Sequence, residues 1–398
     1  MNDRAARGFE LARRIESEGF EAVLVGGAVR DILLGREVGD LDIATSARHE
    51  ELASLFPKGR AVGPEGKRVF LVPCEGGSCE VVSYAGSLEG ELARRDFTVN
   101  ALAMRATGEI VRAGSGLDDI RDRLLRFNGS PPDRLREDPL RALRLPRFAA
   151  ELHGFTVDPG SRDFVRAVRP PVEQCAPERI GREMRLGLSG DAPIFVRTLD
   201  DCGLAGLLEP LVGVRASPAV IVRALERLDT GAEPLVRRAA ALALFRGWAD
   251  SPGREGEGVR TVLARWGWPS AVVARVTLLV RKRSAFGRGD ARREAVSLLL
   301  DHGWEFCLSL ASVLEEVLGS DRAALLRATA ASLLPRMATL KERIPSGDEL
   351  MEHLSLREGP LVGRILRELS EEHLLRDFPS RERALKAAEL LAKDHKEG

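Results

Sequence analysis

The sequence contains few cysteines and no long apolar segment. Five cysteines lie at positions 74, 79, 175, 202 and 307 among 398 residues. The one close pair, Cys74 and Cys79, does not have the spacing of a zinc knuckle or a redox motif, so reduced thiols are expected. No run approaches the roughly 18 apolar residues of a membrane span, and the charged first twenty residues lack the apolar core of a signal peptide. These absences predict a cytoplasmic protein.

An excess of charge of either sign is also absent. The chain has 60 basic and 60 acidic residues, and a formal net charge of zero counts at first against a nucleic-acid partner. Nearly all the basic residues are arginine, however, and they cluster from Arg121 to Arg185. A local basic groove is compatible with acidic compensation elsewhere, so net charge does not exclude RNA. None of the six dispersed histidines directly precedes an aspartate, so a phosphohydrolase module of the histidine-aspartate type is not indicated.

The hydrophobic period changes along the chain. Up to about residue 113, short strand-like runs alternate with helical ones, which predicts an α/β arrangement. The expected strands are 22–25, 40–44, 68–72, 78–84 and 109–112, and the expected helices are 28–34, 49–56 and 96–104. From about Asp118 onward apolar residues recur at three and four, which predicts helices throughout. Examples are 219–228, 236–248, 259–266, 271–280, 293–300 and 383–391. Residues 250–258, with a proline and three glycines, are either a linker or a loop between two helices.

The stretch LVGGAVRDILLGREVGDLDIAT is the most informative in the chain. Gly26-Gly27 follows an apolar run and lets the backbone turn sharply and approach a ligand before a helix, whose N-terminus favours phosphate. Asp40 and Asp42 alternate with Leu41, so on a strand they project from one side and can hold divalent cations. Such a pair suits metal-assisted phosphoryl or nucleotidyl transfer. The competing interpretation is a tight strand-helix turn with two solvated aspartates.

Two further segments carry complementary chemistry. RRDFTVNAL, from Arg94, places two guanidinium groups, an acid and an amide before an apolar helical face. LREDPLRALRLPRF, from Leu135, repeats arginine every third residue behind an acidic pair, so on a helix Asp138 and Arg141 would be close neighbours. One end of this helix can read a base while the other meets phosphates. An exposed, salt-bridged helix face is the competing interpretation of such a ladder.

In sequence order, these blocks resemble the motifs of class II tRNA nucleotidyltransferases, the family of CCA-adding enzymes and bacterial poly(A) polymerases. GLDDIRDRLLRF and the segment from Pro177 to Glu183 resemble further motifs, and the resemblance covers about residues 20 to 190. It implies an α+β fold with a polymerase-β-like nucleotidyltransferase head at 1–113. A helical neck with a base-reading helix would follow at 114–190, and an all-helical, tRNA-binding body and tail at 191–398.

The resemblance also implies roles in attack of an RNA 3′-hydroxyl on the α-phosphate of a nucleoside triphosphate. Asp40 and Asp42 are expected to bind Mg²⁺, which suits hard oxygen ligands and triphosphate. Glu80 would position the hydroxyl, or is an ordinary exposed strand residue. The triphosphate contacts would be Gly27, Arg30 and Arg95, although Arg30 could instead be a surface residue paired to Asp31.

Base selection is expected to depend on protein groups because no nucleic-acid template is used. Arg141 can donate to the ring nitrogen and carbonyl of cytosine while Asp138 accepts from its exocyclic amine, as a Watson-Crick partner would. By resemblance, Arg144 and Arg147 make further nucleotide contacts. Glu137 is expected to cap or orient the helix. Pro146 predicts a kink that makes the aim of Arg147 less certain.

One departure from the family bears on the product. Full CCA-adding relatives usually carry an extra flexible, charged loop before RRDFT, whereas residues 85–91 make this connection almost directly, as in the CC-adding branch. The leading hypothesis is therefore a tRNA nucleotidyltransferase that adds cytidines to the tRNA 3′ end from CTP, with a complete CCA-adding enzyme, also using ATP, as the nearest alternative. A poly(A) polymerase and a catalytically silent RNA-binding protein are the others, and the intact acidic and basic motif residues argue against silence.

Overall fold

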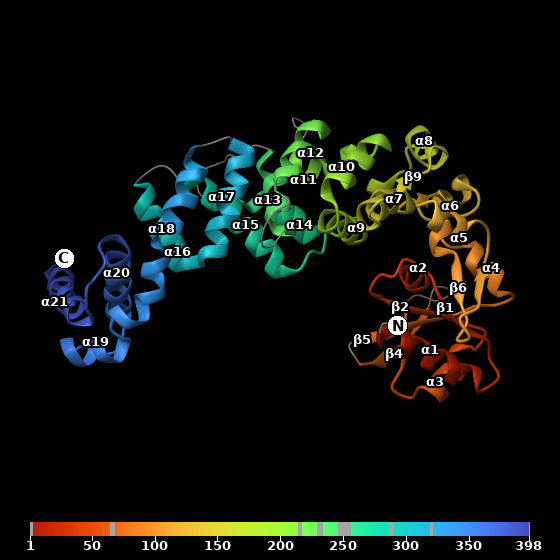
Figure 1. Cartoon of the computed structure of the whole chain (residues 1–398), viewed down its shortest axis with the longest axis horizontal. Helices are drawn as coiled ribbons and strands as arrows, with labels where there is room; N and C mark the ends of the chain where they lie inside the picture. Colours follow the sequence, from red (N-terminus) through yellow and green to blue (C-terminus); the bar gives the residue numbers. More distant parts are fainter. Residues whose placement is uncertain are drawn as a thin grey trace. The chain divides into compact units, whose positions relative to one another are not determined.

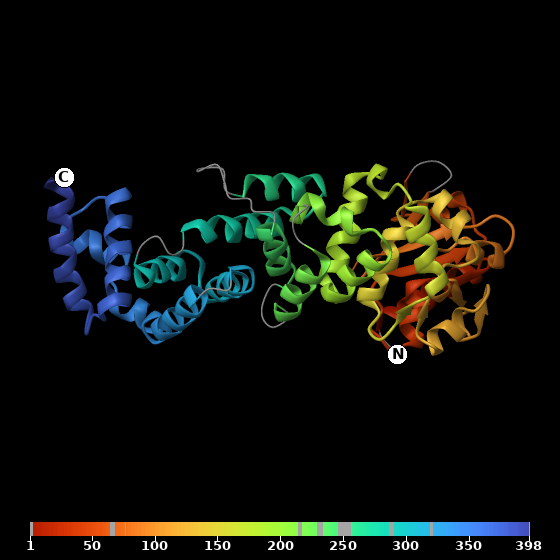
Figure 2. The same ribbon diagram turned by 90° about the horizontal axis from the view of Figure 1, so that it is seen from above.

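The structure, a computed structural model, describes residues 3–63, 68–75, 77–213, 217–228, 234–245, 256–285, 290–318 and 321–397. The chain divides into two compact units, Met1–Gly206 and Leu207–Gly398. The strands belong to the first unit, drawn in red to yellow-green, and the described part of the second consists of helices and their connections (Figures 1 and 2). Every site residue predicted from the sequence lies in the first unit.

The first unit contains a seven-stranded sheet in the order β3-β4-β5-β2-β1-β6-β7. All neighbouring strands are antiparallel except β2 and β5, which run parallel and place Asp42 opposite Glu80. β1 is buried at all four positions, as its apolar run predicts. The strands are β1 (Ala22–Val25), β2 (Leu41–Thr45), β3 (Arg60–Val62), β4 (Val69–Cys74), β5 (Gly77–Ser83), β6 (Leu102–Met104) and β7 (Ile110–Arg112).

Short helices connect and cover these strands. α1 buries a stripe spaced by three and four residues, from Ala5 through Phe9 and Ala12 to Ile15, and packs on β1 and β2. α4 buries Leu88 and Leu92 in a cluster with Val23 and Ala103. The elements are α1 (Asp3–Glu16), α2 (Gly27–Leu33), α3 (His49–Leu55), α4 (Leu88–Ala93), the 3-10 turn η1 (Thr98–Asn100) and α5 (Gly116–Arg121).

The rest of the first unit is a group of helices in which α7 packs on α9 and α10. Gly187 of α9 permits this packing, because a Cβ there would lie 2.4 Å from the Phe195 ring. The helices are α6 (Pro131–Glu137), α7 (Arg141–Glu151), α8 (Pro159–Val168), η2 (Val172–Gln174), α9 (Pro177–Ser189) and α10 (Ala192–Asp201). Between them, β8 (Leu124–Leu125) and β9 (Thr156–Val157) form a small parallel pair.

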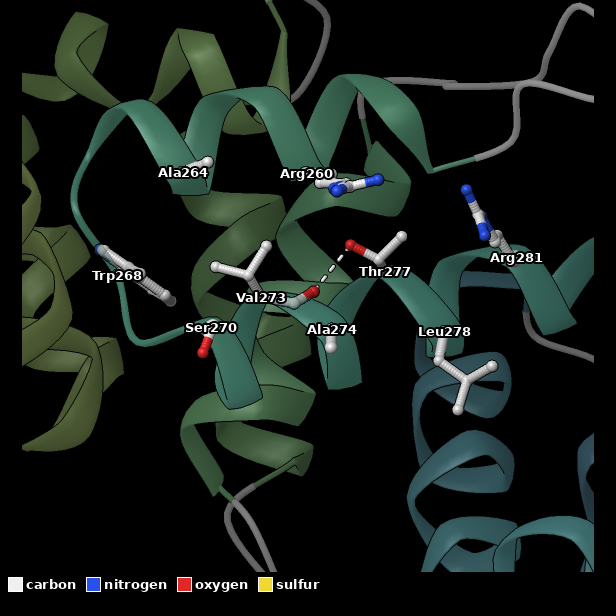
Figure 3. Close-up of a pocket in the computed structure, with 9 residues that line it drawn as sticks. All are labelled: Arg260, Ala264, Trp268, Ser270, Val273, Ala274, Thr277, Leu278 and Arg281. Atoms are coloured by element: carbon white, nitrogen blue, oxygen red, sulfur yellow. Dashed lines mark hydrogen bonds between the residues drawn. The ribbon is translucent and has the colours of Figure 1, made fainter.

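The second unit packs its helices around apolar side chains, with one cluster formed by residues of α18 to α21 around Leu350, Ile365 and Leu369. A hollow of about 660 Å³ lies between α14 and α15 and is lined by Arg260, Trp268, Thr277, Arg281 and five other residues, none of them acidic (Figure 3). The elements are η3 (Ala205–Leu208), which spans the boundary between the units, α11 (Glu209–Val212), α12 (Pro218–Arg227), α13 (Pro234–Phe245), α14 (Glu257–Arg265), α15 (Ser270–Ala285), α16 (Ala291–His302), α17 (Trp304–Leu318), α18 (Asp321–Arg343), α19 (Gly347–Leu354), α20 (Pro360–Arg376) and α21 (Arg381–Glu397).

The expected fold class, an α+β head followed by helices, is confirmed. Two local expectations are wrong. The helix expected over 96–104 is a 3-10 turn followed by β6, which pairs with β1 and β7. The continuous helix expected to carry both Asp138 and Arg141 is interrupted, since α6 ends at Glu137 and α7 begins at Arg141. Most of the segment 250–258 lies outside the described residues, and within the described ranges no helix combines the length and apolar character that membrane crossing requires.

Candidate active site

Three acidic residues lie near one another where β2 and β5 run side by side, close enough for Asp40 and Glu80 to influence the charge of Asp42. Asp42 is the second residue of β2, Asp40 lies just before the strand, and Glu80 faces Asp42 in the parallel register. Asp40 and Glu80 are exposed, whereas Asp42 is half-buried. Burial raises the pKa of Asp42 to about 6; Arg95 opposes this shift, and the nearby charges of Glu80 and Asp40 reinforce it. Negative charge is therefore crowded at this edge, as it is at many cation sites.

The glycine turn brings an arginine to the same place. Gly26 has a φ of 70°, and a Cβ built on it would lie 2.3 Å from Nη1 of Arg95 and 3.5 Å from Oδ2 of Asp42. Its amide donates to the carbonyl of Leu102 at 3.1 Å, which ties the turn to the strand after η1. The buried Nε of Arg95 has no hydrogen-bond partner among the described residues. Arg95 thus lies beside Asp42 with donor capacity left for a ligand.

Arg30 lies next to Gly27 but in the protein interior. A Cβ on Gly27 would be 3.6 Å from Nη2 of Arg30, whose residue is only 3% exposed. The guanidinium donates to both oxygens of Asp31 at 3.0–3.1 Å and to Asn100 at 2.8 Å. The pairing with Asp31 exists, but it is buried and not on the surface as the alternative interpretation assumed. A triphosphate contact by Arg30 stays a prediction.

Arg30 belongs to a closed chain of polar contacts that we call the arginine circuit. Its members, in order round the circuit, are Arg30, Asn100, Asp96, Arg144, Glu183, Arg147 and Glu151, and Glu151 contacts Arg30 again.

The aromatic ring of Phe148 lies among the three arginines of this circuit. The Arg147 guanidinium is 3.5 Å from the ring centroid, and those of Arg30 and Arg144 are 5.4 and 5.9 Å away. The circuit joins α2 and the segment around η1 to α7 and α9. It therefore holds the head against the helices that follow.

Asp96 is the acid of the circuit that comes from the RRDFT segment. It is buried, accepts from the Phe97 amide and the Asn100 side chain, and pairs with Arg144 at 2.8 Å. Burial alone would raise its pKa, but Arg144 and these two hydrogen bonds hold the pKa below its ordinary value. The amide and the acid quoted from the sequence therefore serve the interior, while Arg95 faces the site.

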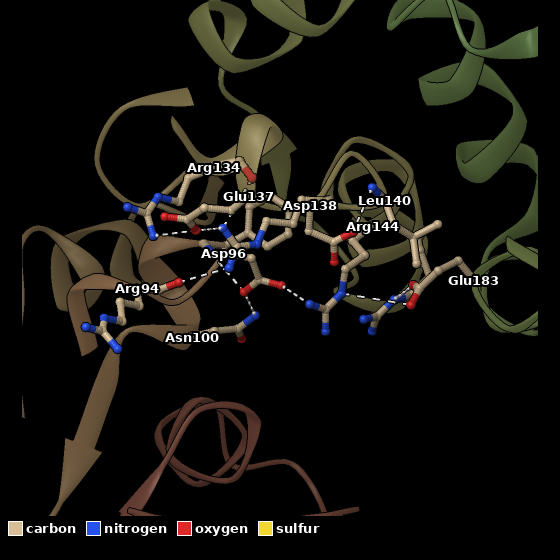
Figure 4. Close-up of polar contacts among 12 residues, drawn as sticks. Arg94, Asp96, Asn100, Arg134, Glu137, Asp138, Leu140, Arg144 and Glu183 are labelled. Atoms are coloured by element: carbon tan, nitrogen blue, oxygen red, sulfur yellow. Dashed lines mark hydrogen bonds and ion pairs between the residues drawn. The ribbon is translucent and has the colours of Figure 1, made fainter. Parts of the chain in front are cut away.

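The predicted base-reading residues, Asp138 and Arg141, come from two separate elements; Figure 4 shows Asp138 beside Glu137 and Leu140. Asp138 is extended, with φ −156° and ψ 103°, between α6 and α7. Arg141 begins α7, where it binds Glu137 at 2.5 Å and the carbonyls of Arg134 and Arg94 at 3.2 and 3.1 Å. Glu137, the last residue of α6, thus holds the Arg141 side chain. The continuous helix that was to make Asp138 and Arg141 neighbours is replaced by a helix break.

Arg144 and Arg147 differ in their exposure. The Arg144 side chain is 35% exposed, and Arg147 donates from the interior to Glu183 at 2.9 Å and to Glu151 at 2.5 Å. α7 continues through Pro146 to Glu151. Sequence reasoning gave no role to Glu183, Asn100 or Arg179, although Glu183 and Arg179 lie in the segment quoted as a motif. Arg179 and Glu183 lie four residues apart on α9, and this spacing, which places them on one face of the helix, was the available signal.

The chain is similar to known proteins of one family. A model of the poly(A) polymerase head domain matches residues 22–81 and 68–126. The CCA-adding enzyme of Levilactobacillus brevis is 30% identical over 401 residues, covering 96% of this chain and 97% of that enzyme. The CC-adding tRNA nucleotidyltransferase of Shouchella clausii is 43% identical over 184 residues, 46% of this chain and 48% of that protein. The solved CCA-adding enzyme of Bacillus stearothermophilus in complex with CTP is 28% identical, with a TM-score of 0.72 over 100% of this chain and 99% of that one.

Fold and site define a nucleotidyltransferase head followed by helices. More narrowly, the chain belongs to the family of class II tRNA nucleotidyltransferases and bacterial poly(A) polymerases. The alignments to the first curated relatives span about half of their length, whereas the alignment to the Levilactobacillus enzyme spans nearly all of it.

Proposed function

We propose that this chain is a template-independent tRNA nucleotidyltransferase that adds cytidines from CTP to the 3′ end of tRNA. The observation that carries the proposal is the meeting of Asp42, the Gly26 turn and Arg95 at the parallel strand pair. This arrangement offers carboxylates for a cation and an arginine for a triphosphate within one site. Relatives named as CC-adding and CCA-adding enzymes support the substrate class.

Enzymes of this family normally use a divalent metal, and we assign Mg²⁺ to Asp40 and Asp42. The described residues offer no ready-made cluster of three or more metal ligands. This fits Mg²⁺, which is commonly held by one or two carboxylates together with substrate phosphates. Burial is the main cause of the raised pKa of Asp42, and the nearby charges of Glu80 and Asp40 add to it; a bound cation would favour the ionised carboxylate. When bound, such metals stabilise the attacking and leaving oxygens of the displacement.

The remaining roles follow from position. Arg95 binds the triphosphate, aided by the Gly27 backbone, and Arg30 supports this turn from the interior. Glu80, exposed opposite Asp42, is placed to position the attacking 3′-hydroxyl. A displacement of this kind needs mainly positioning and charge stabilisation, which these groups supply.

Asp138 and Arg141 select the base. The Arg141 guanidinium donates to Glu137 and to two backbone carbonyls, and this leaves some of its N–H groups available for a base. Its side chain is 16% exposed. Arg144, one turn further on α7 and more exposed, can contact the nucleotide. Arg147 is buried against Phe148 and Glu183, so we assign it to supporting α7.

The short connection after β5 favours addition of two cytidines over the whole CCA end. β5 ends at Ser83 and α4 begins at Leu88, with Ser87 accepting a hydrogen bond from the Gly90 amide as its N-cap. Leu88 and Leu92 are buried, so the segment is anchored to the sheet. It therefore offers little length for a loop that could re-aim the base-reading pair.

We further propose that the head occupies residues 1–113, the neck 114–190 and a tRNA-binding body and tail 191–398. The hollow in the second unit is lined by Arg260 and Arg281, whose positive charges are compatible with a phosphate backbone (Figure 3). The enzyme is proposed to act in the cytoplasm, where its substrates are found.

Extension of a tRNA that lacks its 3′ end, resolved to one nucleotide, tests the proposal. With CTP, alone or with ATP, we expect two added cytidines and then a stall. Efficient addition of one adenosine after the cytidines would instead identify the complete CCA-adding activity. Long extension of generic RNA by ATP alone would identify a poly(A) polymerase, and no extension with any nucleotide would favour the silent RNA-binding protein.

A further inference from the structure

The carboxylate of Asp138 is held by side-chain contacts and not by a helix. Its backbone is extended between α6 and α7, so no helical geometry fixes the direction of its side chain. Oδ1 accepts from the Leu140 amide at 3.3 Å, and Oδ2 accepts from Nη2 of Arg179 at 2.6 Å. The second contact is the shorter one and joins two charged groups, so it dominates the orientation of the carboxylate.

Arg179 reaches Asp138 from α9, a helix distant in sequence. Four residues further along the same helix, Glu183 accepts from Arg147 at 2.9 Å and lies 3.9 Å from Arg144. One face of α9 therefore fixes Asp138 through Arg179 and fixes the arginines of α7 through Glu183. Arg141 is held separately, by Glu137 and the Arg94 carbonyl. The mutual aim of Asp138 and Arg141 thus depends on contacts from different elements.

The Arg179–Asp138 pair also has room for a ligand. The side chains of Arg179 and Asp138 are 54% and 24% exposed. A carboxylate has about four lone-pair sites, so one bond to Arg179 and one to Leu140 leave acceptors for an exocyclic amine. Cytosine presents an amine at this position, whereas uracil presents a carbonyl that an aimed carboxylate would repel.

We propose that Arg179 is a specificity-determining positioning residue, which aims the Asp138 carboxylate at the incoming base so that CTP is accepted and UTP rejected. The proposal rests on the proposed function, because it requires that Asp138 reads the base. Without Arg179, the 3.3 Å contact with the Leu140 amide is the one hydrogen bond within the described residues that holds the Asp138 carboxylate. The carboxylate is then fixed less firmly, and the carbonyl of uracil is repelled less. Arg179 is exposed and Asp138 is half-buried, so removal of the Arg179 side chain should change stability little.

The test compares Arg179→Ala with Arg179→Lys, Asp138→Asn and a matched control in the full chain. The control is Arg162→Ala, which removes an exposed Arg162–Asp163 pair of 2.8 Å on α8. For each protein, kcat/KM for the first addition is measured with CTP and with UTP, together with inhibition by pyrophosphate and the melting temperature. We expect Arg179→Ala to lower the CTP-to-UTP preference roughly ten- to a hundredfold, without changing pyrophosphate inhibition. The lysine variant should recover part of the preference, and the control should keep all of it.

The outcomes separate the two proposals. If Asp138→Asn loses the preference and Arg179→Ala keeps it, the role of Arg179 is refuted while base reading by Asp138 stands. If Asp138→Asn also keeps the preference, the base-reading assignment itself fails. A rise in CTP efficiency in Arg179→Ala with the preference intact would show that Arg179 competes with the base, and would overturn the inference.

Discussion

At the scale of single residues, Asp42 has the environment that its proposed role requires. It is half-buried beside Glu80 and Asp40, and Arg95 is the positive charge that opposes the rise of its pKa most strongly. A side chain selected only for stability would gain little from such neighbours, because burial and like charges both disfavour its ionised form. Its presence there is more readily explained by a cation.

Replacing Asp42 by alanine is expected to abolish nucleotide addition while leaving fold and tRNA affinity nearly unchanged. Loss of a metal ligand and its charge should lower kcat about a thousandfold or more. Single-turnover extension with saturating CTP and Mg²⁺ measures this effect, and filter binding measures tRNA affinity. Asp163→Ala, which changes an exposed residue of α8, is the matched control. Near-normal turnover of the Asp42 variant would disprove the metal assignment.

Asp96 predicts a pH dependence of stability. Its ordinary pKa is 3.8, and the folded value is lower because Arg144, Asn100 and the Phe97 amide outweigh burial. A group with a depressed folded pKa stabilises the protein at neutral pH and loses this contribution as the pH falls through and below about 4. We expect Asp96→Asn to reduce the free energy of unfolding at pH 7 by about 1–3 kcal/mol. Urea unfolding should show this difference shrinking toward pH 3; a constant difference would contradict the assignment.

At the scale of elements, the segment between β5 and α4 bears on product length. To add adenosine after cytidine, Asp138 and Arg141 must be re-aimed, since adenine presents a larger ring and a different edge. α4 is capped by Ser87 and anchored by Leu88 and Leu92, which leaves only residues 84–87 between it and β5. This connection is thus too short and too firmly anchored to move Asp138 and Arg141 into a second arrangement.

Insertion of a longer, charged loop after Gly86 is expected to permit some adenosine addition without loss of cytidine addition. Gly86 has a φ of 93° and its Cβ would meet open space, so the site tolerates added chain. Products should be resolved on sequencing gels with CTP and ATP together. An insertion of equal length and uncharged composition is the control. Continued stalling of both proteins after two cytidines would show that the loop is not the determinant.

The sequence predicted most elements but not how some of them associate. The apolar runs at 22–25 and 49–56 became a strand and a helix because their periods are clear. Residues 96–104 have a helical spacing of apolar groups. Leu102–Met104 nevertheless forms a strand that pairs with β1 and β7, and β1 is remote in sequence. The break at Asp138 precedes Pro139, which disfavours helical backbone at the residue before it, and this local signal was available.

The site was predictable as a set of residue types and not as a set of contacts. Asp42, Arg95 and Asp138 were predicted from their motifs, and their roles stay predictions. That Glu80 faces Asp42 follows only from the parallel register of β2 and β5. Arg30 and Arg147 each have one acid partner close in sequence, Asp31 and Glu151. Their further partners, Glu151 of α7 for Arg30 and Glu183 of α9 for Arg147, are remote, so the burial of the two arginines could not be read locally. Long-range pairing of charges leaves little trace in one sequence.

At the scale of the whole molecule, the division at residue 206 separates the proposed catalytic site from most of the proposed tRNA-binding body and tail. A fragment of residues 1–206 is expected to bind CTP with nearly the affinity of the full chain, because the proposed nucleotide contacts all lie within it. Its affinity for tRNA should fall at least about tenfold, since the proposed phosphate contacts of the second unit are lost. Calorimetry with CTP and filter binding with tRNA test this pair of effects. Equal tRNA affinity of fragment and full chain would refute a tRNA-binding body and tail.

The turn at Gly26 also limits which substitutions this enzyme can accept. Any side chain at position 26 would have to adopt a φ of 70° and would displace the end of Arg95, although Arg95 is flexible enough for the fold to survive. The variant would be a folded protein in which Arg95, the proposed triphosphate contact, is misplaced. At Gly27, by contrast, a Cβ meets Arg30 only at ordinary contact distance. The position of the Arg95 guanidinium therefore depends on the absence of a side chain at Gly26, and a substitution there is expected to weaken the proposed triphosphate contact.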